Sequence, residues 1–239
     1  MSLPHMDLAP QPSPSASAVA DRVAEVRARI ADAVQRGGHA QRVALVAVTK
    51  THPAEVVGQV WSAGVHDVGE NRVQEALHKM AAVNVPVRWH LIGHLQRNKV
   101  RQVDEFALIH ACDSGRLADA LHDHGVARHR PVDVLLQVNV SGEASKGGYD
   151  VDLVRPEAER LTALAGIVVR GVMTIAPFDA DEHALRAIFA GARGARAALA
   201  AAGHPATELS MGMSGDYEIA VEEGATLVRL GSALFGARA

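Results

Sequence analysis

Residues 43–50 of this 239-residue chain read Val-Ala-Leu-Val-Ala-Val-Thr-Lys. Such a run of small apolar and β-branched residues is typical of a strand that is buried on both faces, as strands in parallel sheets are. The run ends at Lys50, and burial of a lysine favours its neutral amine, which is the better nucleophile. The pattern therefore indicates an amine that could form a Schiff base with a carbonyl compound. The alternative is that Lys50 only marks the point where the strand reaches solvent.

From Arg42 onward, short apolar runs alternate with segments of helical periodicity. Strands are expected near residues 43–49, 66–69, 87–93, 107–111, 132–140, 167–174, 206–211 and 226–230. Helices are expected near residues 53–63, 71–82, 97–104, 114–124, 150–164, 181–202 and 214–223. Eight strands that alternate with helices predict a parallel sheet, and eight strands close a single (β/α)8 TIM barrel. An open doubly wound sheet is the alternative, disfavoured because no Gly-x-Gly-x-x-Gly motif follows an early strand.

The segment before the barrel divides into a tail and a helix. Residues 1–16 are rich in proline and serine and are expected to be a disordered tail. The residues that follow repeat an apolar side chain every three or four positions, which predicts an extra N-terminal helix that ends at Gly37 and Gly38. The apolar positions are Val19, Val23, Val26, Ile30 and Val34. Because no linker interrupts the later pattern, residues 17–239 are expected to form one barrel domain.

The composition excludes several classes of protein. The formal net charge is −3, from 24 basic and 27 acidic side chains, so neither a nucleic-acid partner nor a membrane partner is expected. The one cysteine, Cys112, cannot form an intramolecular disulfide. No apolar run approaches the roughly 18 residues of a membrane span, and the N-terminus lacks the features of a signal peptide. The sequence therefore predicts a cytoplasmic protein.

Polar residues and glycines gather after the seventh and eighth predicted strands. The segment Glu-Leu-Ser-Met-Gly-Met-Ser, residues 208–214, ends the seventh strand, and Val-Arg-Leu-Gly-Ser, residues 228–232, ends the eighth. In a TIM barrel, ligands bind at the carboxyl ends of the strands, and phosphate groups often bind after strands 7 and 8. Closure of the barrel places these segments beside Lys50 on the first strand. A phosphorylated aldehyde is the ligand that such a combination fits.

Two further strands contribute polar residues to the same rim. Asn71 follows the second strand, where it could contact a ligand or cap the next helix. His90 ends the third strand and is expected to lie in the core with a hydrogen bond, whereas His94 and Gln96 are expected at the rim.

The histidine content does not predict a metal site. His122, His124 and His129 lie close together in the sequence, but their spacing does not place them on one face of a helix. No Cys-x-x-Cys or His-Glu-x-x-His motif accompanies them. We therefore expect these three side chains to be solvated at the surface.

Seven motifs in a fixed order resemble those of the pyridoxal-phosphate homeostasis proteins, which are small barrels similar to the N-terminal domain of bacterial alanine racemase. The match runs from about residue 42 to residue 236. The motifs are Val-Thr-Lys (48–50), Gly-Glu-Asn-Arg-Val-Gln-Glu (69–75), Trp-His-Leu-Ile-Gly-His-Leu-Gln-Arg-Asn-Lys (89–99), Gln-Val-Asn-Val-Ser-Gly-Glu-Ala-Ser-Lys-Gly-Gly (137–148), Gly-Val-Met-Thr-Ile-Ala (171–176), Ser-Met-Gly-Met-Ser-Gly-Asp (210–216) and Val-Arg-Leu-Gly-Ser-Ala-Leu-Phe-Gly (228–236).

The resemblance implies a cofactor and residues that hold it. Lys50 would carry pyridoxal 5′-phosphate (PLP) as a covalent aldimine, and Arg229 would face the pyridine nitrogen. The phosphate would be held by Ser210, Gly231 and Ser232. In addition to these five residues, Asn71 remains a candidate contact on the rim, and Lys146 matches a family lysine that makes a secondary contact.

The same resemblance leaves open whether the chain is an enzyme. A permanently cationic arginine beside the ring nitrogen disfavours the pyridinium form that serves as an electron sink. Racemases of this type also use a tyrosine from a partner domain, whereas Tyr149 and Tyr217 here fall in a loop and at a helix start. We therefore expect a monomeric PLP-binding protein for vitamin B6 homeostasis, with little or no turnover and with PLP-dependent apo-enzymes as possible recipients. The alternatives are a weak racemase-like enzyme and a lysine aldolase that binds a phosphorylated sugar without a cofactor.

Overall fold

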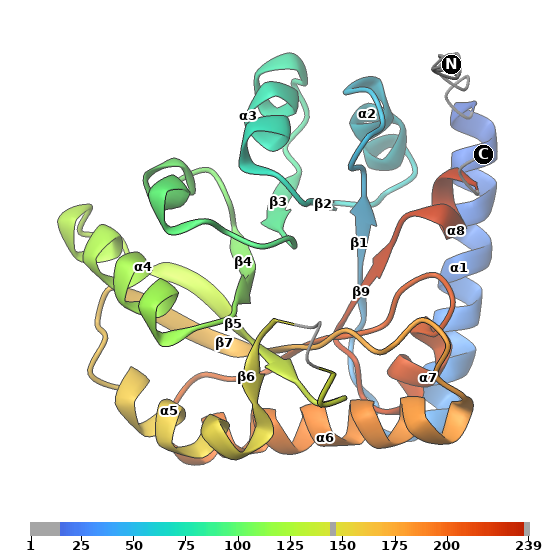
Figure 1. Ribbon diagram of the computed structural model, residues 1–239. Helices are drawn as coiled ribbons and strands as arrows, with labels where there is room; N and C mark the ends of the chain where they lie inside the picture. Colours follow the sequence, from blue (N-terminus) through green and yellow to red (C-terminus); the bar gives the residue numbers. More distant parts are fainter. Residues whose placement is uncertain (1–14, 144–146, 237–239) are drawn as a thin grey trace, which may run out of the picture.

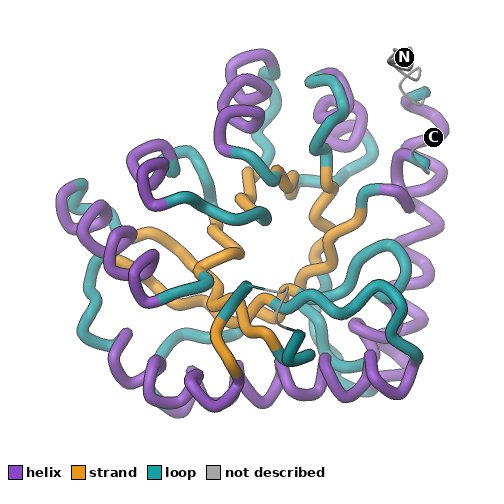
Figure 2. The backbone as a smooth tube through the Cα atoms, viewed as in Figure 1, coloured by secondary structure: helices purple, strands orange, loops and turns teal. Residues whose placement is uncertain are grey.

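The computed structural model describes residues 15–143 and 147–236, whose strands form a barrel surrounded by helices (Figures 1 and 2). The barrel strands are β1 (Ala44–Val48), β2 (Asp67–Glu70), β3 (Arg88–Leu91), β4 (Leu108–Cys112), β5 (Val132–Asn139), β7 (Ile167–Met173), β8 (Glu208–Ser210) and β9 (Leu227–Leu230). Neighbouring strands pair in parallel in the order β4-β3-β2-β1-β9-β8-β7-β5, and a β4–β5 pairing completes the ring. The predicted eight-stranded TIM barrel is confirmed.

Helices follow the strands around the outside of the barrel (Figure 1). They are α2 (Glu55–Ser62), α3 (Val73–Ala82), the 3-10 helix η1 (Arg97–Gln102), α4 (Gly115–Ala127), the 3-10 turn η2 (Val151–Leu153), α5 (Val154–Leu161), α6 (Glu182–Ala201), α7 (Tyr217–Glu222) and α8 (Ser232–Phe235). Within the described ranges, no helix combines the length and apolar character that crossing a membrane would require.

Three local features differ from the sequence prediction. The helix expected over residues 97–104 is a 3-10 helix in which only Val100 is buried, so it lacks the apolar stripe that stabilises an α-helix. The strand β6 (Tyr149–Asp150), which pairs with β5, and the four-residue helix α8 were not predicted. Each is too short to show a periodic pattern in the sequence.

The extra N-terminal helix is α1 (Ala16–Gly37), which lies along the outside of the barrel beside α7 and α8 (Figure 1). Ser15 caps its start by accepting a hydrogen bond from the amide of Ala18, and Gly38 ends it in the left-handed conformation, with φ +69°. Four of the five predicted apolar positions are buried, and Val34 is partly buried against the same core. Arg36 forms ion pairs with Glu218 and Glu222 near α7. The predicted helix is therefore confirmed as part of the barrel.

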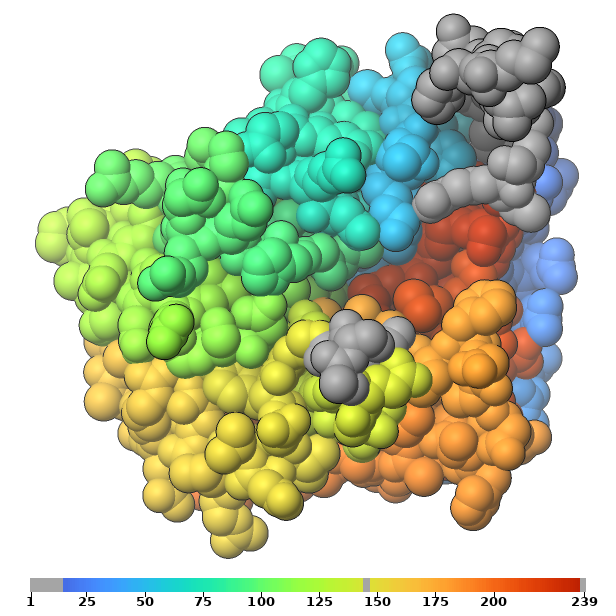
Figure 3. Space-filling model, viewed as in Figure 1, coloured from blue at the N-terminus to red at the C-terminus, as the bar shows by residue number. Residues whose placement is uncertain are grey.

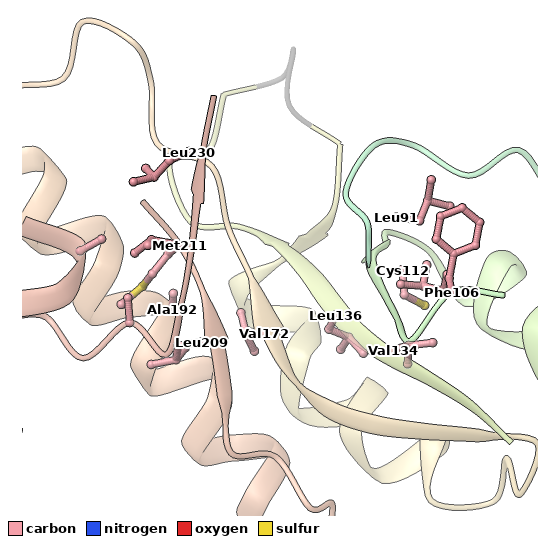
Figure 4. Packing of buried hydrophobic residues seen from close by; sticks show 14 of the residues in the cluster. Leu91, Phe106, Cys112, Val134, Leu136, Val172, Ala192, Leu209, Met211 and Leu230 are labelled. Carbon is pink, nitrogen blue, oxygen red and sulfur yellow. The ribbon is translucent and has the colours of Figure 1, made fainter. Parts of the chain in front are cut away.

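The main core lies between the strands and the surrounding helices (Figure 4). Leu209, Met211 and Leu230 pack toward α6 in one part of this core, and Leu136 packs with Cys112 in another. All of these side chains are fully buried. The aliphatic core that holds the strands in place is what allows polar residues to be fixed at the strand ends.

The inside of the barrel contains a second, smaller apolar cluster together with an unusual number of polar groups. The apolar members are Val46, Leu108, Ala111, Leu135, Met173 and Leu227. Because strand residues two positions apart share a face, His110 lies on the same side as Leu108, and Arg229 lies on the same side as Leu227. Asp67, His90 and Ser210 are also buried and bonded to this group. The barrel interior is therefore partly polar.

Candidate functional site

A cavity of about 1010 Å³ opens at the carboxyl ends of the strands. In the space-filling view, the surface is hollowed between the cyan and blue segments and the orange and red segments (Figure 3). Five of the six predicted site residues line this cavity: Lys50, Asn71, Arg229, Gly231 and Ser232. They come from the ends of β1, β2 and β9, which are neighbours in the ring. The barrel thus brings together residues that are up to 182 positions apart in the sequence.

Lys50 lies two residues beyond the carboxyl end of β1, on the cavity wall. β1 ends at Val48, Thr49 is fully buried, and Lys50 is partly exposed on the cavity wall. Thr51, the next residue, has φ +67°, a left-handed conformation that is strained for a β-branched side chain. Its amide donates a 2.6 Å hydrogen bond to Oε1 of Glu75 on α3. The backbone on the far side of Lys50 is therefore fixed by a carboxylate.

A buried ion cluster holds the same turn from beneath. Nζ of Lys79, which is only 3% exposed, donates to Oε1 of Glu70 at 2.6 Å, to Oε1 of Glu75 at 2.9 Å and to the carbonyl oxygen of Thr49 at 2.7 Å. The hydroxyl of Thr49 also donates to Oε1 of Glu70. Burial raises the pKa of Glu70, and the bonds from Lys79 and Thr49 counter that effect. Lys79 is thus a structural cation that clamps the backbone on both sides of Lys50.

Arg229 lines the cavity from the inside of the barrel. It is 5% exposed; Nη1 donates to Oγ of Ser210 at 2.6 Å, and Nη2 donates to the carbonyl oxygen of Thr174 at 2.9 Å. Burial lowers the pKa of the guanidinium to about 10, so it still carries its positive charge at neutral pH. These two bonds occupy two of the five N–H groups of the side chain. Because Arg229 also lines the cavity, its side chain combines these two bonds with a position beside any ligand that enters there.

Ser210 is the predicted site residue that does not reach the cavity wall. It is completely buried, and its Oγ is bonded both to Arg229 and to Nδ1 of His110, at 2.8 Å. Ser214, four residues later, does line the cavity, and its Oγ accepts a hydrogen bond from the amide of Ala233 at 3.1 Å. The loops after β8 and β9 are therefore joined at the cavity wall through Ser214.

The rim after β3 and β4 carries a hydrogen-bonded pair. Nδ1 of His94 lies 2.7 Å from Oδ2 of Asp113, and both residues line the cavity. His94 was predicted at the rim, whereas Asp113 was not among the predicted site residues. Gln96, the other predicted rim residue, is exposed outside the cavity lining. The backbone of Asn71 packs closely against Gly93, just after β3. A Cβ added to Gly93 would lie 2.4 Å from the Asn71 carbonyl oxygen, so there is no room for a side chain there.

Neither tyrosine of the chain lines the cavity among the described residues. The hydroxyl of Tyr149 donates to Oε1 of Glu157 at 2.9 Å, and burial raises the pKa of Tyr149 far above its usual range. Tyr217 is 4% exposed at the start of α7. Both side chains therefore serve the packing of the outer helices.

The remaining predicted groups lie away from the cavity. Within residues 15–143 and 147–236, no three metal-ligating side chains come together. His124 is bonded to Asp104 at 2.8 Å, and His122 accepts the amide of Gly166, so these two rings are packed and not merely solvated as expected. Lys146 lies outside the described residues.

The chain is similar to known proteins over most of its length. Residues 22–239 match the family described as alanine racemase, N-terminal domain. The pyridoxal phosphate homeostasis protein of Pseudomonas aeruginosa is 43% identical over 225 residues, which cover 93% of this chain and 96% of that protein. The chain belongs to the pyridoxal phosphate homeostasis protein family. Its counterpart in Aquifex aeolicus is 39% identical over 222 residues, which cover 91% of this chain and 97% of that protein.

Solved structures extend the comparison within the pyridoxal phosphate homeostasis protein family. PipY of Synechococcus elongatus, solved without PLP and with PLP bound, is 38% identical, with TM-scores of 0.83 and 0.81. In both comparisons, the match covers 91% of this chain and 100% of PipY. Alanine racemase from Corynebacterium glutamicum, at 17% identity and a TM-score of 0.72 over 93% of this chain and 61% of the racemase, shares the barrel fold. The family resemblance found in the motifs is confirmed.

Proposed function

We propose that this chain binds PLP as a Schiff base on Lys50 and takes up and releases the cofactor, with little or no catalytic turnover. The names of its relatives and the PLP-bound form of PipY support the choice of cofactor. The observation that carries the proposal is that Lys50 and Arg229 line one cavity with the Gly-Ser segments after β8 and β9. The donor set suits PLP: an amine for its aldehyde, a cation for its ring nitrogen, and hydroxyls and amides for its phosphate.

Each residue then has a defined role. Arg229 donates a hydrogen bond toward the pyridine nitrogen, and Asn71 contacts the ring from the cavity wall. Gly231 and Ser232 receive the phosphate, together with Ser214, which the motif match did not include. Ser210 acts indirectly in this scheme, because its buried hydroxyl is already bonded to Arg229 and His110.

Little turnover is expected because PLP catalysis needs a protonated ring nitrogen and a positioned acid or base, and the site favours neither. Bound PLP stabilises carbanions best when its ring nitrogen is protonated, and a cationic arginine opposes that protonation. An enzyme of this kind also needs a positioned acid or base on the cavity wall. Neither tyrosine occupies that position in the described part of the chain. Both arguments favour a binding protein.

A weak racemase-like activity is the second candidate function, and one observation favours it. His94 lines the cavity and is held by Asp113, as a histidine that transfers protons often is. If amino acids do react, His94→Ala abolishes racemisation and leaves PLP binding unchanged. Chiral chromatography of L-amino acids incubated with the PLP-loaded protein measures this activity.

A transfer assay tests the proposed function. The protein is loaded with PLP, freed of excess cofactor and mixed with the apo form of a PLP-dependent enzyme, whose activity is followed over time. We expect activity to appear with the wild-type protein and not with Lys50→Ala that has been through the same incubation and removal of excess cofactor. Light scattering on the same sample is expected to show a monomer. Racemisation of amino acids at rates typical of enzymes, or a protein that does not bind added PLP, would contradict the proposal.

A further inference from the structure

A continuous chain of side-chain hydrogen bonds crosses the inside of the barrel and ends at Arg229. Oδ1 of Asp67 lies 2.9 Å from Nε2 of His90, and Nδ1 of His90 lies 2.9 Å from Nε2 of His110. Nδ1 of His110 lies 2.8 Å from Oγ of Ser210, which lies 2.6 Å from Nη1 of Arg229. The five residues come from β2, β3, β4, β8 and β9. All five are at most 5% exposed.

Such a chain is unusual for the inside of a barrel, where branched apolar side chains normally pack in layers. Burial of polar groups is unfavourable unless every group is hydrogen-bonded. Here, no atom of the five side chains is among the buried polar atoms without a partner in the described part of the chain. Every polar group of this hydrogen-bond chain therefore has a partner, which favours one arrangement of its protons.

The chemistry of the groups fixes the direction of that arrangement. A guanidinium can only donate, so Oγ of Ser210 accepts from Arg229 and its single proton goes to Nδ1 of His110. Burial, with the nearby charge of Arg229, lowers the pKa of His110 well below its usual range, so that ring carries one proton. This proton must be on Nε2, which donates to Nδ1 of His90, and His90 in turn donates from Nε2 to Asp67.

Asp67 anchors the far end of the chain. Burial alone would raise its pKa, but hydrogen bonds from His90 and Arg88 outweigh burial and hold that pKa below its usual value. Oδ2 of Asp67 accepts from Arg88 at 2.7 Å. Asp67, Arg88 and His90 line a second cavity, of about 390 Å³, at the amino ends of the strands. The hydrogen-bond chain thus runs from Asp67, which lines the cavity at the amino ends of the strands, to Arg229, which lines the cavity at their carboxyl ends.

We infer that His90 and His110 are positioning residues for Arg229: through Ser210 they keep a hydrogen-bond acceptor beneath the guanidinium, so that its remaining donors point at the pyridine nitrogen of the bound cofactor. This inference rests on the proposed function of Arg229. If the hydrogen bonds ran in the opposite direction, the His110 proton would be on Nδ1 and the Ser210 hydroxyl proton would have no acceptor. The hold on Arg229 would then weaken, although neither histidine lines the cofactor cavity.

Two substitutions of His90 separate this role from packing. In His90→Asn, the amide oxygen can lie near the position of Nδ1 and still accept from His110. In His90→Gln, the longer amide reaches the position of Nε2, so the contact with Asp67 is kept and the acceptor for His110 is lost. Tyr149→Phe is a control: it removes one buried hydroxyl, which donates to Oε1 of Glu157 away from the cavity lining.

The first test needs no cofactor. Nitrogen-15 NMR of the imidazole rings in the cofactor-free protein reads which nitrogen of His110 carries the proton. We expect Nε2–H in the wild type, in His90→Asn and in Tyr149→Phe, and Nδ1–H in His90→Gln. A proton on Nδ1 in the wild type, or no change in His90→Gln, would overturn the directed chain.

The second test uses the PLP-loaded protein. His90→Gln is expected to weaken PLP binding about tenfold and to change the ratio of the absorbance bands of the bound cofactor at fixed pH. His90→Asn should restore both values to within about twofold of the wild type, and Tyr149→Phe should leave them unchanged. If His90→Gln does not fold, Ser210→Ala, which removes the last link, is expected to give the same two changes. An unchanged spectrum in the folded variant, or equal losses in His90→Gln and His90→Asn, would contradict the inference.

The two tests also separate this inference from the proposed function. Failure of the wild type to attach PLP at Lys50, together with the expected tautomers, would count against the proposed function and leave the directed chain supported. Attachment at Lys50 with the wrong tautomers would do the reverse.

Discussion

At the amino ends of the strands, Arg88 and Arg170 each lie within ion-pair distance of a carboxylate, whereas Arg229 at the carboxyl ends is held by a hydroxyl and a carbonyl. In the described part of the chain, the carboxylate that acts on Arg229 is Asp216, whose charge raises the pKa of the guanidinium without a direct hydrogen bond to it. A buried cation that is not directly neutralised is unfavourable without a purpose. The difference indicates that the opening at the amino ends of the strands, the lower mouth, is closed by ion pairs. The opening at the carboxyl ends, the upper mouth, is suited to an electron-rich ligand.

Two lysines near the end of β1 differ in where their amines lie. Lys79 is bonded to two carboxylates and to a backbone carbonyl, and it lies outside the cavity lining. Lys50 lines the cavity beside Arg229 and Ser232. Burial alone therefore does not identify a nucleophilic lysine, which must also lie where an aldehyde can reach it, as Lys50 does on the cavity wall and Lys79 does not.

The substitution with the largest expected effect removes the amine from the upper mouth. Lys50→Ala should weaken PLP binding by about a hundredfold or more, because the covalent bond is lost. The thermal unfolding midpoint should stay close to that of the wild type, since the side chain is partly exposed. Absorbance titration with PLP measures the binding, and Lys99→Ala, a lysine outside the cavity lining, is the control. Equal PLP binding by Lys50→Ala and the wild type would show that Lys50 does not bind PLP covalently.

Neutralising the cation of the upper mouth should have the next largest effect. Arg229→Gln keeps part of the side chain's length and removes its charge, so PLP binding should weaken about tenfold to a hundredfold. The absorbance bands of the bound cofactor should also change, because the partner of the ring nitrogen has changed. Arg229→Lys is not expected to restore them, since an ammonium cannot reproduce the planar donors held by Ser210 and Thr174. Full recovery in Arg229→Lys would show that only charge matters at this position.

The clamp beneath Lys50 should affect stability more than binding. Lys79→Met leaves Glu70 and Glu75 without their cation and should lower the free energy of unfolding by about 3 kcal/mol. Because the clamp also fixes the turn at Thr51, PLP binding should weaken by a factor of about three. Urea unfolding and absorbance titration measure the two effects. The double variant Lys79→Met/Glu70→Gln should recover part of the stability, and no recovery would argue against an electrostatic origin.

A substitution at the lower mouth should have the smallest effect. Arg170 and Asp133 form a half-exposed pair at 3.0 Å, so Arg170→Ala should change the free energy of unfolding by less than about 1 kcal/mol. PLP binding should not change, because the pair lies at the opposite end of the barrel from Lys50. A clear loss of PLP binding in Arg170→Ala would mean that the two mouths are coupled more strongly than their geometry indicates.

The sequence predicts the features that periodicity and local chemistry determine. Alternating apolar runs gave the eight strands, and the lysine at the end of the first strand gave the location of the cavity. His90 was correctly expected in the core with a hydrogen bond. Its partners His110 and Asp67 could not be predicted, because they depend on the register of β2, β3 and β4, which no local pattern encodes.

Register also explains the placement of Ser210. This residue pairs with Leu227, two positions before Arg229, so it lies one layer deeper in the barrel than the cavity wall. The sequence places it at a strand end but does not say how far that end reaches. The cluster around Lys79 was missed for a similar reason: it joins a helix to two strands, and only their packing brings Glu70, Glu75 and Thr49 together.

The most direct test of the central claim is borohydride reduction of the protein after incubation with PLP, followed by peptide mapping by mass spectrometry. The chain has four lysines to compare, which are Lys50, Lys79, Lys99 and Lys146. We predict a phosphopyridoxyl adduct confined to Lys50, with Lys79 protected by its carboxylates. No adduct, or an adduct spread over Lys99 and Lys146 at the level found on Lys50, would contradict the account.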